Sequence, residues 1–431
     1  MTESKSKAIS RRNFLVKSSI GAVAATGFPF VRTSRAQQVK PIRIGVCGCG
    51  GRGSGAAANA LSAAPGVQLI AMADPFSGQI EKSLKALKSD EDLQKKGLLG
   101  NIKVAEDHIF TGMDCYRKIL ETDIDYVILA EPPGFRPPHF EAAVEAGKHI
   151  FAEKPLGTDP VGVRKIRAAA EKAKEGGLSV VVGLNYRHDL GAQETVKRIH
   201  DGQAGKVLSG RIYRLGRGLW HRGSSPSWSQ MEYQCRNWYY FCWLSGDQIV
   251  EMVIHHIDLM NWAMGGPPVR ALGNGGRQQR TEDKYGNIWD HMTIDYEYPG
   301  GVHVSCMIRQ WNNCDTKMGN VVVGSQGESD SLEVIRGQNR WRYPGEITNH
   351  YVLEHTKLIE SIRKGEPRND VLDFGADSTL TAIMGRESAY TGMEVTWEEM
   401  LSSELDLFPK TSEFGSAPQR PVPIPGQPRP L

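Results

Sequence analysis

Short apolar runs alternate with amphipathic stretches along the first part of the chain. The apolar runs have the length and composition of buried strands, and they cover residues 42–47, 67–73, 126–130, 149–152 and 179–184. Helical spacing is found between them, at residues 55–61, 79–88, 115–121 and 139–147, and another helix is expected to begin at Asp159-Pro160. Alternating strands and helices predict a parallel, doubly wound sheet of the Rossmann type.

The pattern changes near Tyr186 to longer runs with a period of two. Residues 292–298 and 302–308 alternate apolar and polar side chains on either side of Pro299-Gly300-Gly301, which predicts a β-hairpin. Further strands are expected at 320–324 and 331–335, and closing helices at 351–364 and 374–390. This part of the chain is therefore expected to form an α+β domain around a half-exposed antiparallel sheet.

The first strand runs directly into a glycine-rich loop with the spacing G-x-G-x-x-G. Such a match is weak by itself in a chain with 47 glycines, but a strand before it and a helix after it strengthen the reading. We expect Gly48 to make the tight turn, Gly50 to let the backbone approach a pyrophosphate, and Gly53 to permit close helix packing. The predicted phosphate-binding residues are Gly48, Cys49, Gly50, Gly51, Arg52 and Gly53.

The second strand ends in Asp74, where a dinucleotide-binding domain places its ribose-binding acid. A carboxylate at this point accepts hydrogen bonds from the ribose hydroxyls and repels a 2′-phosphate. Asp74 therefore favours NAD over NADP, although NADP stays open. The alternative is an aspartate that only caps a helix or a turn.

Charge is distributed unevenly along the chain. The formal net charge is +3, but the first 36 residues carry seven basic side chains against one acid, which leaves −3 for the rest. A nucleic-acid partner therefore loses its electrostatic support. With 431 residues, the chain is long enough for two domains.

The basic start of the chain is typical of an export signal. Residues 10–15, Ser-Arg-Arg-Asn-Phe-Leu, resemble the twin-arginine motif, and the apolar run at 20–30 is too short to span a bilayer. We expect cleavage after Ala36 and delivery to the periplasm, or otherwise outside the cytoplasm, by the twin-arginine machinery. The twin-arginine route carries folded proteins. An enzyme that acquires its nucleotide in the cytoplasm must be exported in this folded state. A basic disordered tail is the alternative.

The cysteines give no support for a metal or a disulfide framework. There are seven, an odd number, and no pair of Cys-x-x-Cys units is found. We therefore expect no metal, and we interpret Cys47 and Cys49 as small packing residues of the glycine loop.

Several short motifs together resemble the glucose-fructose oxidoreductase and inositol dehydrogenase family (Gfo/Idh/MocA). They are the glycine loop, Ala73-Asp74, Pro132-Pro133 followed by His139, Gly147-Lys148-His149, Glu153-Lys154-Pro155, Asn185-Tyr186-Arg187 and Glu251-x-x-x-His255-x-x-Asp258. The resemblance implies a second domain with a large open, mostly antiparallel sheet, a homo-oligomer, and a sugar or cyclitol substrate. It also implies further nucleotide contacts from Pro133, His139, Glu153 and Asn185.

These observations divide the chain into four parts. We expect a signal peptide at 1–36, an NAD-binding Rossmann domain at 37–186, a substrate and oligomerisation domain at 187–410, and a proline-rich tail at 411–431. The tail is expected either to wrap a neighbouring surface or subunit, or to be disordered.

Oxidation of an alcohol requires a group that takes the hydroxyl proton while hydride leaves the carbon. Lys154 lies at the end of a strand, beside the expected nicotinamide position, where its ammonium can stabilise the developing alkoxide. In the family that this chain resembles, the lysine that matches Lys154 is catalytic. The alternative is an ordinary surface lysine.

A helix expected at 247–262, capped by Ser245 or Asp247, brings a second group of candidates together. Glu251, His255 and Asp258 are spaced to share one face. His255 is the expected proton acceptor, and Glu251 is expected to orient it or to raise its pKa. The family usually has aspartate in place of Glu251, so a direct substrate contact by this carboxylate is in doubt. A metal site and a plain core helix are the alternatives.

Substrate recognition is expected from side chains that suit a sugar or a cyclitol. The predicted set is Tyr186, Arg187, Trp238, Tyr240 and Asp258. Aromatic clusters of this kind form part of a protein core as often as they bind a sugar. A core cluster is therefore an equal alternative to substrate binding.

The sequence as a whole predicts an exported NAD(P)-dependent oxidoreductase that acts on a sugar or polyol hydroxyl. Free NAD is not supplied outside the cytoplasm, so the cofactor is expected to be tightly bound. The alternatives are an NAD-dependent glycoside hydrolase that oxidises its sugar transiently, and a catalytically silent sugar-binding protein. The retained Lys154 favours the dehydrogenase.

Overall fold

The computed structural model describes residues 40–427. The predicted signal peptide at 1–36 and the last four residues of the tail lie outside the described residues. Among the described helices, none is long and apolar enough to cross a membrane.

The first sheet has six parallel strands in the order β3-β2-β1-β4-β5-β6, which is the doubly wound Rossmann order. This confirms the predicted fold class. The strands are β1 (Ile42–Cys47), β2 (Val67–Ala73), β3 (Ile109–Phe110), β4 (Tyr126–Leu129), β5 (His149–Ala152) and β6 (Val180–Val182). The helices between them are α1 (Gly51–Ala63), α2 (Ser77–Lys88), α3 (Glu91–Lys95), α4 (Cys115–Leu120), α5 (Arg136–Glu145) and α6 (Pro160–Glu175).

Two helix starts in this sheet show how local chemistry sets the boundaries. The carboxylate of Asp159 accepts a hydrogen bond from the Gly162 amide, and Pro160 opens α6 as predicted. Helix α5 starts at Arg136, three residues before the predicted helix at 139–147, because the prolines of its first turn need no intrahelical amide bond.

Within residues 40–427, the second sheet has nine strands, and β7 with β10 is its only parallel pair. The strands are β7 (Val207–Gly216), β8 (Arg270–Gly276), β9 (His291–Tyr298), β10 (Val302–Gln310), β11 (Lys317–Gly324), β12 (Gly327–Ser329), β13 (Val334–Gly337), β14 (Trp341–Arg342) and β15 (Val395–Thr396). The predicted hairpin is β9 and β10. The strand predicted at 331–335 begins only at Val334, because Asp330 accepts three backbone amides and forms a turn there.

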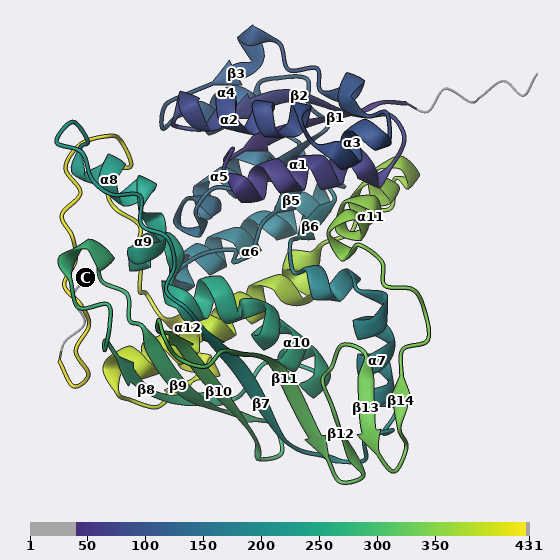
Figure 1. The fold of residues 1–431 in the computed structure, drawn as a ribbon, viewed down its shortest axis with the longest axis vertical. Helices are drawn as coiled ribbons and strands as arrows, with labels where there is room; N and C mark the ends of the chain where they lie inside the picture. Colours follow the sequence, from purple (N-terminus) through teal and green to yellow (C-terminus); the bar gives the residue numbers. More distant parts are fainter. Residues whose placement is uncertain (1–39, 428–431) are drawn as a thin grey trace, which may run out of the picture. The chain divides into compact units, whose positions relative to one another are not determined.

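Helices from the second half of the chain pack on and around the two sheets. They are α7 (Leu190–His200), α8 (Gln230–Arg236), α9 (Cys242–Ser245), α10 (Ile254–Met264), α11 (His350–Lys364), α12 (Ala376–Thr391) and α13 (Trp397–Ser402). Figure 1 shows α10 and α12 between the Rossmann sheet and the nine-stranded sheet. One hydrophobic core cluster includes Leu129 of β4 and Tyr296 of β9, so the two sheets share a core.

Helix α11 packs on the Rossmann sheet although it follows the second sheet in the chain. Leu358 and Ile359 are fully buried in the core cluster that contains β1 and β2. The hydroxyl of Ser361 donates to that of Ser179, and Asn369 pairs with Val180 at the edge of β6. The nucleotide-binding half is therefore completed by residues from the second half.

The helix predicted at 247–262 differs from the observed segment. A π turn at Ile249–Val253 precedes α10, and neither Ser245 nor Asp247 caps it. The carboxylate of Asp247 instead accepts hydrogen bonds from the Trp289 amide and the Tyr390 hydroxyl. The predicted cap is wrong because the carboxylate accepts hydrogen bonds from these two buried donors and the adjacent Gln248 amide, and from none of the amides of the first turn.

The segment that follows α13 lies against its own chain. The Leu407 amide donates to Asp159, the Gln234 side chain donates to the Ala417 carbonyl, and the Trp289 indole donates to the Pro423 carbonyl. Up to residue 427, the tail is therefore part of the folded unit.

Candidate active site

The glycine loop connects β1 to α1, at the carboxyl end of the Rossmann sheet. Gly48 has φ +92°, a conformation that favours glycine. A Cβ on Gly53 would overlap the carbonyl oxygen of Gly48, whereas a Cβ on Gly50 or Gly51 would meet open space. Gly50 is the N-cap of α1 and has no side chain that could accept the first-turn amides. These amides therefore have no intrahelical partner and face the open space beside Gly50 and Gly51. A dinucleotide pyrophosphate fits this loop.

Asp74 lies beside the loop, where a ribose-binding acid is expected. Its carboxylate accepts hydrogen bonds from the Cys49 amide at 2.8 Å and from the Phe76 amide at 2.9 Å. Burial raises the pKa of this carboxyl, and the two amides oppose the change. The backbone of two loops thus fixes the position of Asp74.

Arg52 and Glu153, both predicted to contact the nucleotide, are paired with each other. Arg52 Nε lies 3.0 Å from Glu153 Oε1, and the guanidinium stacks over the ring of Tyr351 at 4.9 Å. Tyr351 belongs to α11, as does Glu354, whose buried carboxylate oxygens have no hydrogen-bond partner among the described residues. Sequence reasoning missed both, because no local motif connects α11 with the glycine loop.

Lys154 and Glu251 form the central ion pair of the site. Lys154 Nζ lies 2.8 Å from Glu251 Oε1 and also donates to the Glu251 carbonyl at 2.6 Å. Both side chains are close to nine-tenths buried. Glu251 lies in the π turn, an irregularity that is frequent at functional sites. The carboxylate therefore holds the lysine at the carboxyl end of β5.

His255 lies near this pair but does not depend on Glu251. Burial, and then the charge of Lys154, lower its pKa well below 6.5, so the imidazole is neutral at pH 7. This differs from the expected rise in pKa, because Glu251 binds Lys154 instead. His255 Nδ1 has no hydrogen-bond partner within residues 40–427. A neutral imidazole with a free nitrogen can accept a proton.

Tyr186 brings three histidines around one ring. Its centroid lies 5.9 Å from those of His255 and His350, and 6.0 Å from that of His256. Burial raises the pKa of the Tyr186 phenol, which keeps its proton at neutral pH. The preceding residue, Asn185, is buried, and its side-chain oxygen has no partner in the described part of the chain. That free acceptor fits a carboxamide donor of a nucleotide.

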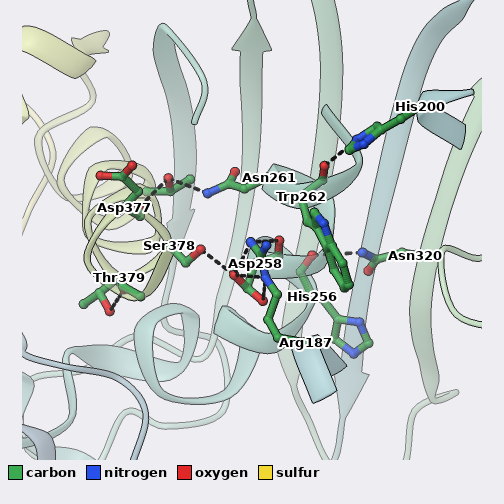
Figure 2. Close-up of polar contacts among 12 residues, drawn as sticks. Arg187, His200, His256, Asp258, Asn261, Trp262, Asn320, Asp377, Ser378 and Thr379 are labelled. Carbon is green, nitrogen blue, oxygen red and sulfur yellow. Dashed lines mark hydrogen bonds and ion pairs between the residues drawn. The ribbon is translucent and has the colours of Figure 1, made fainter. Parts of the chain in front are cut away.

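Arg187 and Asp258, both predicted to bind substrate, neutralise each other. Arg187 Nε and Nη2 lie 2.9 and 2.8 Å from the two carboxylate oxygens of Asp258, and the Ser378 hydroxyl donates to the same carboxylate at 2.7 Å (Figure 2). The guanidinium is stacked between the rings of Trp262 and Phe374. These contacts satisfy the groups internally, which favours a structural role, and their contact with a substrate stays a prediction. The groove that Arg187 lines does not include Lys154, Glu251 or His255.

Asp258→Asn is expected to lower the free energy of unfolding by about 3 kcal/mol, because the change leaves the Arg187 charge buried without its partner. Urea denaturation measures the loss. The matched control is Ser378→Ala, which removes one hydrogen bond and is expected to cost about 1 kcal/mol. Equal losses in the two variants would contradict the structural role of the pair.

The aromatic substrate candidates divide between core and surface. The Tyr240 ring is fully buried, and its hydroxyl donates to the carbonyls of Leu219 and Trp220. Tyr240 is therefore a core residue, and its predicted sugar contact is corrected. Trp238 is partly exposed and meets Trp220 edge to face at 6.1 Å.

Two further predicted nucleotide contacts lie inside the Rossmann domain. Pro133 is buried in a short turn. His139 is buried and stacked on Tyr116, with Nδ1 3.7 Å from Glu131 and 3.9 Å from Cys47. Burial lowers the pKa of His139 to about 3. His139 therefore packs against Cys47 at the start of the glycine loop, and its contact with a nucleotide stays a prediction.

Cys47, Glu131 and His139 are a group of three possible metal ligands in the described part of the chain. Burial raises the pKa of Glu131 to about 7, and the nearby Arg136 opposes the change. The Arg136 guanidinium lies 3.6 Å from Glu131 and already supplies a positive charge to this carboxylate. This arrangement favours an internal ion pair over a metal ion.

Models of one protein family match both halves of the chain. A model of the oxidoreductase family with an NAD-binding Rossmann fold, GFO_IDH_MocA, matches residues 42–184, and the GFO/IDH/MocA C-terminal domain matches residues 193–329. The chain is 26% identical to the scyllo-inositol 2-dehydrogenase (NAD(+)) of Bacillus subtilis over 234 residues, which cover 54% of this chain and 57% of that protein. It is also 26% identical to a glycosyl hydrolase family 109 protein of Saccharopolyspora erythraea over 227 residues, 48% of this chain and 46% of that protein. The chain thus matches about half the length of these curated relatives.

Solved structures share the fold. The aldose-aldose oxidoreductase of Caulobacter crescentus superposes with a TM-score of 0.64 at 18% identity, over 83% of this chain and 100% of that one. The scyllo-inositol dehydrogenase of Lactobacillus casei, solved with NAD(H) and scyllo-inositol, gives a TM-score of 0.60 at 18% identity, over 83% of this chain and 99% of that one. At such identities the comparison shows the fold.

Proposed function

Because the chain belongs to the Gfo/Idh/MocA family, we propose that it is an exported NAD-dependent oxidoreductase that acts on a sugar or polyol hydroxyl. The glycine loop, the buried Asp74 and the free side-chain oxygen of Asn185 support nucleotide binding. Relatives named as inositol dehydrogenases support the substrate class.

The nicotinamide, when bound, supplies the acceptor for the hydride. The protein must position the hydroxyl, stabilise negative charge on its oxygen and take its proton. The Lys154 ammonium, held by Glu251, stabilises the charge. His255 is neutral, and its Nδ1 has no hydrogen-bond partner among the described residues, so it is available as the proton acceptor.

The observation that carries this proposal is the buried Lys154–Glu251 pair beside a neutral histidine, at the carboxyl end of a Rossmann strand. A lysine used only as a surface charge would be solvated. Here the Lys154 side chain is close to nine-tenths buried. Its ammonium is held in place by the carbonyl oxygen and the carboxylate of Glu251. A residue that stabilises charge on a reacting oxygen requires such a fixed position.

The proposal is tested in two steps. Mass spectrometry of the molecules released on denaturation should identify NAD. The protein with its nucleotide bound is then mixed with a panel of inositols and aldoses, and reduction of the nicotinamide is followed by absorbance in a single turnover. If no nucleotide binds, or if no polyol or aldose reduces it, the proposed activity is wrong.

Similarity to glycosyl hydrolase family 109 proteins favours a second candidate, in which oxidation is transient and a glycosidic bond is cleaved. Adding glycosides to the same panel separates the two. Release of a sugar from a glycoside, without net reduction of the nucleotide at the end of the reaction, would favour the hydrolase.

Export is part of the proposal and rests on Arg11 and Arg12 ahead of a short apolar run. Replacement of both arginines by lysine is expected to leave the precursor in the cytoplasm, because the twin-arginine machinery reads the pair. Cell fractionation and N-terminal sequencing are the measurements. If the variant still yields mature protein beginning at Gln37 outside the cytoplasm, the signal assignment is wrong.

A further inference from the structure

Arg214 lies on the face of the nine-stranded sheet that is turned toward α10. Along β7, Gly210 and Ile212 are buried, and Arg214 continues the same alternation. A Cβ on Gly210 would lie 3.0 Å from the Met260 side chain of α10. Figure 1 shows α10 against this part of the sheet. Arg214 is therefore on the inner face, which packs on the helix that carries His255.

The Arg214 side chain comes close to the end of α10 where the catalytic candidates lie. Asn320 of the neighbouring strand β11 donates to the His256 carbonyl at 2.9 Å (Figure 2). Burial, and then the charge of Arg214, lower the pKa of His256 to about 4. The same charge opposes the rise that burial causes in the pKa of Tyr186, whose ring lies 5.9 Å from that of His255. The guanidinium therefore lies among the residues that surround the proposed proton acceptor.

Arg214 has no partner of opposite charge within residues 40–427. It makes no hydrogen bond and no ion pair there, although its side chain is only partly exposed. The other basic side chains of the site each have a carboxylate partner, in the pairs Lys154–Glu251, Arg52–Glu153 and Arg187–Asp258. Asp189, whose charge also reaches Tyr186, accepts hydrogen bonds from the His350 side chain and the Ala192 amide. A partly buried guanidinium without such a partner favours the binding of an anion.

The inner face of the sheet is open beside Arg214. Met318 of β11 pairs with Arg214 and shares its face, yet Met318 is 63% exposed. The Arg214 Nη1 atom lies 3.5 Å from the position that a Cβ of Gly216 would occupy, so the guanidinium extends along β7 toward a residue without a side chain. A ligand can therefore reach the guanidinium, and the apolar Met318 side chain can pack against one face of a sugar ring.

We propose that Arg214 binds an anionic group of the substrate and that this oxidoreductase acts on acidic sugars, with a carboxylate as the group that fits best. A planar guanidinium donates two parallel hydrogen bonds to a carboxylate, which fixes the orientation of the sugar. This inference rests on the proposed function, since it assumes that bound NAD oxidises a sugar. It narrows the substrate class from sugars and polyols to sugars that carry a negative charge.

Pairs of sugars that differ only at C6 test the substrate class. The protein with NAD bound is mixed with glucuronate or glucose, galacturonate or galactose, and mannuronate or mannose, and reduction of the nicotinamide is followed in a single turnover. In the pair whose ring is accepted, the uronate should reach half of its maximal rate at a concentration about 30-fold lower than the neutral sugar, because hydrogen bonds between charged groups are the strong ones. The matching sugar 6-phosphate is the third arm. If it reacts at lower concentrations than the uronate, the anion site stands and the preference for a carboxylate is overturned.

Arg214→Gln is expected to remove the preference for the uronate. The uronate concentration needed should rise about 30-fold, whereas the neutral sugar should react as it does with the parent. Arg214→Lys keeps the charge without the two parallel donors and should lie between the two. The free energy of unfolding should not change, because Arg214 has no hydrogen bond or ion pair to lose in the described part of the chain. The matched control is Arg211→Gln, which removes an exposed arginine from the opposite face of the same strand.

Two results would overturn the role of Arg214. One is a parent protein that reacts with the neutral sugar of the accepted pair at concentrations as low as with the uronate, and the other is an Arg214→Gln variant that keeps the preference of the parent. In both cases a sugar still reduces the nucleotide, so the proposed function stands. If no sugar of either kind reduces the nucleotide, the proposed function itself fails, and the acidic substrate with it.

Discussion

Lys154→Ala is expected to slow the reduction of bound NAD by a substrate sugar by roughly 100-fold or more, because the developing negative charge loses the cation that stabilises it. Lys154 is the group that Glu251 holds at 2.8 Å, and no other ammonium is held by the π turn among the described residues. Single-turnover absorbance isolates this step from nucleotide release. Nucleotide content should be unchanged, because the glycine loop and Asp74 are intact.

His255→Ala is the companion variant, with a similar expected loss. The double variant should lose less than the product of the two single losses, since residues that act on one oxygen are not additive. The surface variant Lys165→Ala controls for a change of charge alone. If His255→Ala reduces its nucleotide as fast as the parent, His255 is a core histidine, and Tyr186 or Glu251 must be tested as the base.

Gly53→Ala is expected to destabilise the protein by about 3 kcal/mol, because the added Cβ would overlap the Gly48 carbonyl oxygen and force β1 and α1 apart. Thermal and urea unfolding measure this loss. Gly51→Ala is the matched control in the same helical turn. Its Cβ meets open space, and alanine is a better helix former than glycine, so stability should be unchanged or slightly higher.

Gly50→Ala separates folding from nucleotide binding. Its Cβ also meets open space, so stability should be close to that of the parent. The methyl group would, however, stand in the space where the backbone is expected to approach the pyrophosphate. Loss of NAD binding with normal stability is the expected result. Normal NAD affinity in this variant would contradict the placement of the phosphates.

Five strands of the Rossmann sheet could be predicted because their signals are local, whereas β3 was missed because it is only two residues long. Each strand is a short apolar run that ends at a polar residue or a glycine, as at Gly48 and Asp74, and pairing follows the order of a known topology. The β9–β10 hairpin was predictable for the same reason, since alternation and the Pro-Gly-Gly turn are adjacent in the chain.

The internal pairing of the candidate residues could not be predicted. Helical spacing placed Glu251, His255 and Asp258 on one face, but the π turn changes the phase between Glu251 and the others. The hydrophobic pattern of residues 249–262 does not show where one turn of the helix is a π turn, so the sequence alone did not reveal it. The partner of each charged group is likewise set by tertiary packing. Asp258 is bound to Arg187, and Glu251 to Lys154, across long sequence separations.

The packing of Leu358 and Ile359 against β1 and β2 has a consequence for biosynthesis. A nascent chain that has emerged from the ribosome as far as Val182 contains all six Rossmann strands, yet the apolar surface that α11 covers is still open to water. Contacts of such high sequence separation form late in folding. The nucleotide pocket should therefore mature only after α11 has been synthesised, and chaperones that bind apolar surface would have a target on the chain until then.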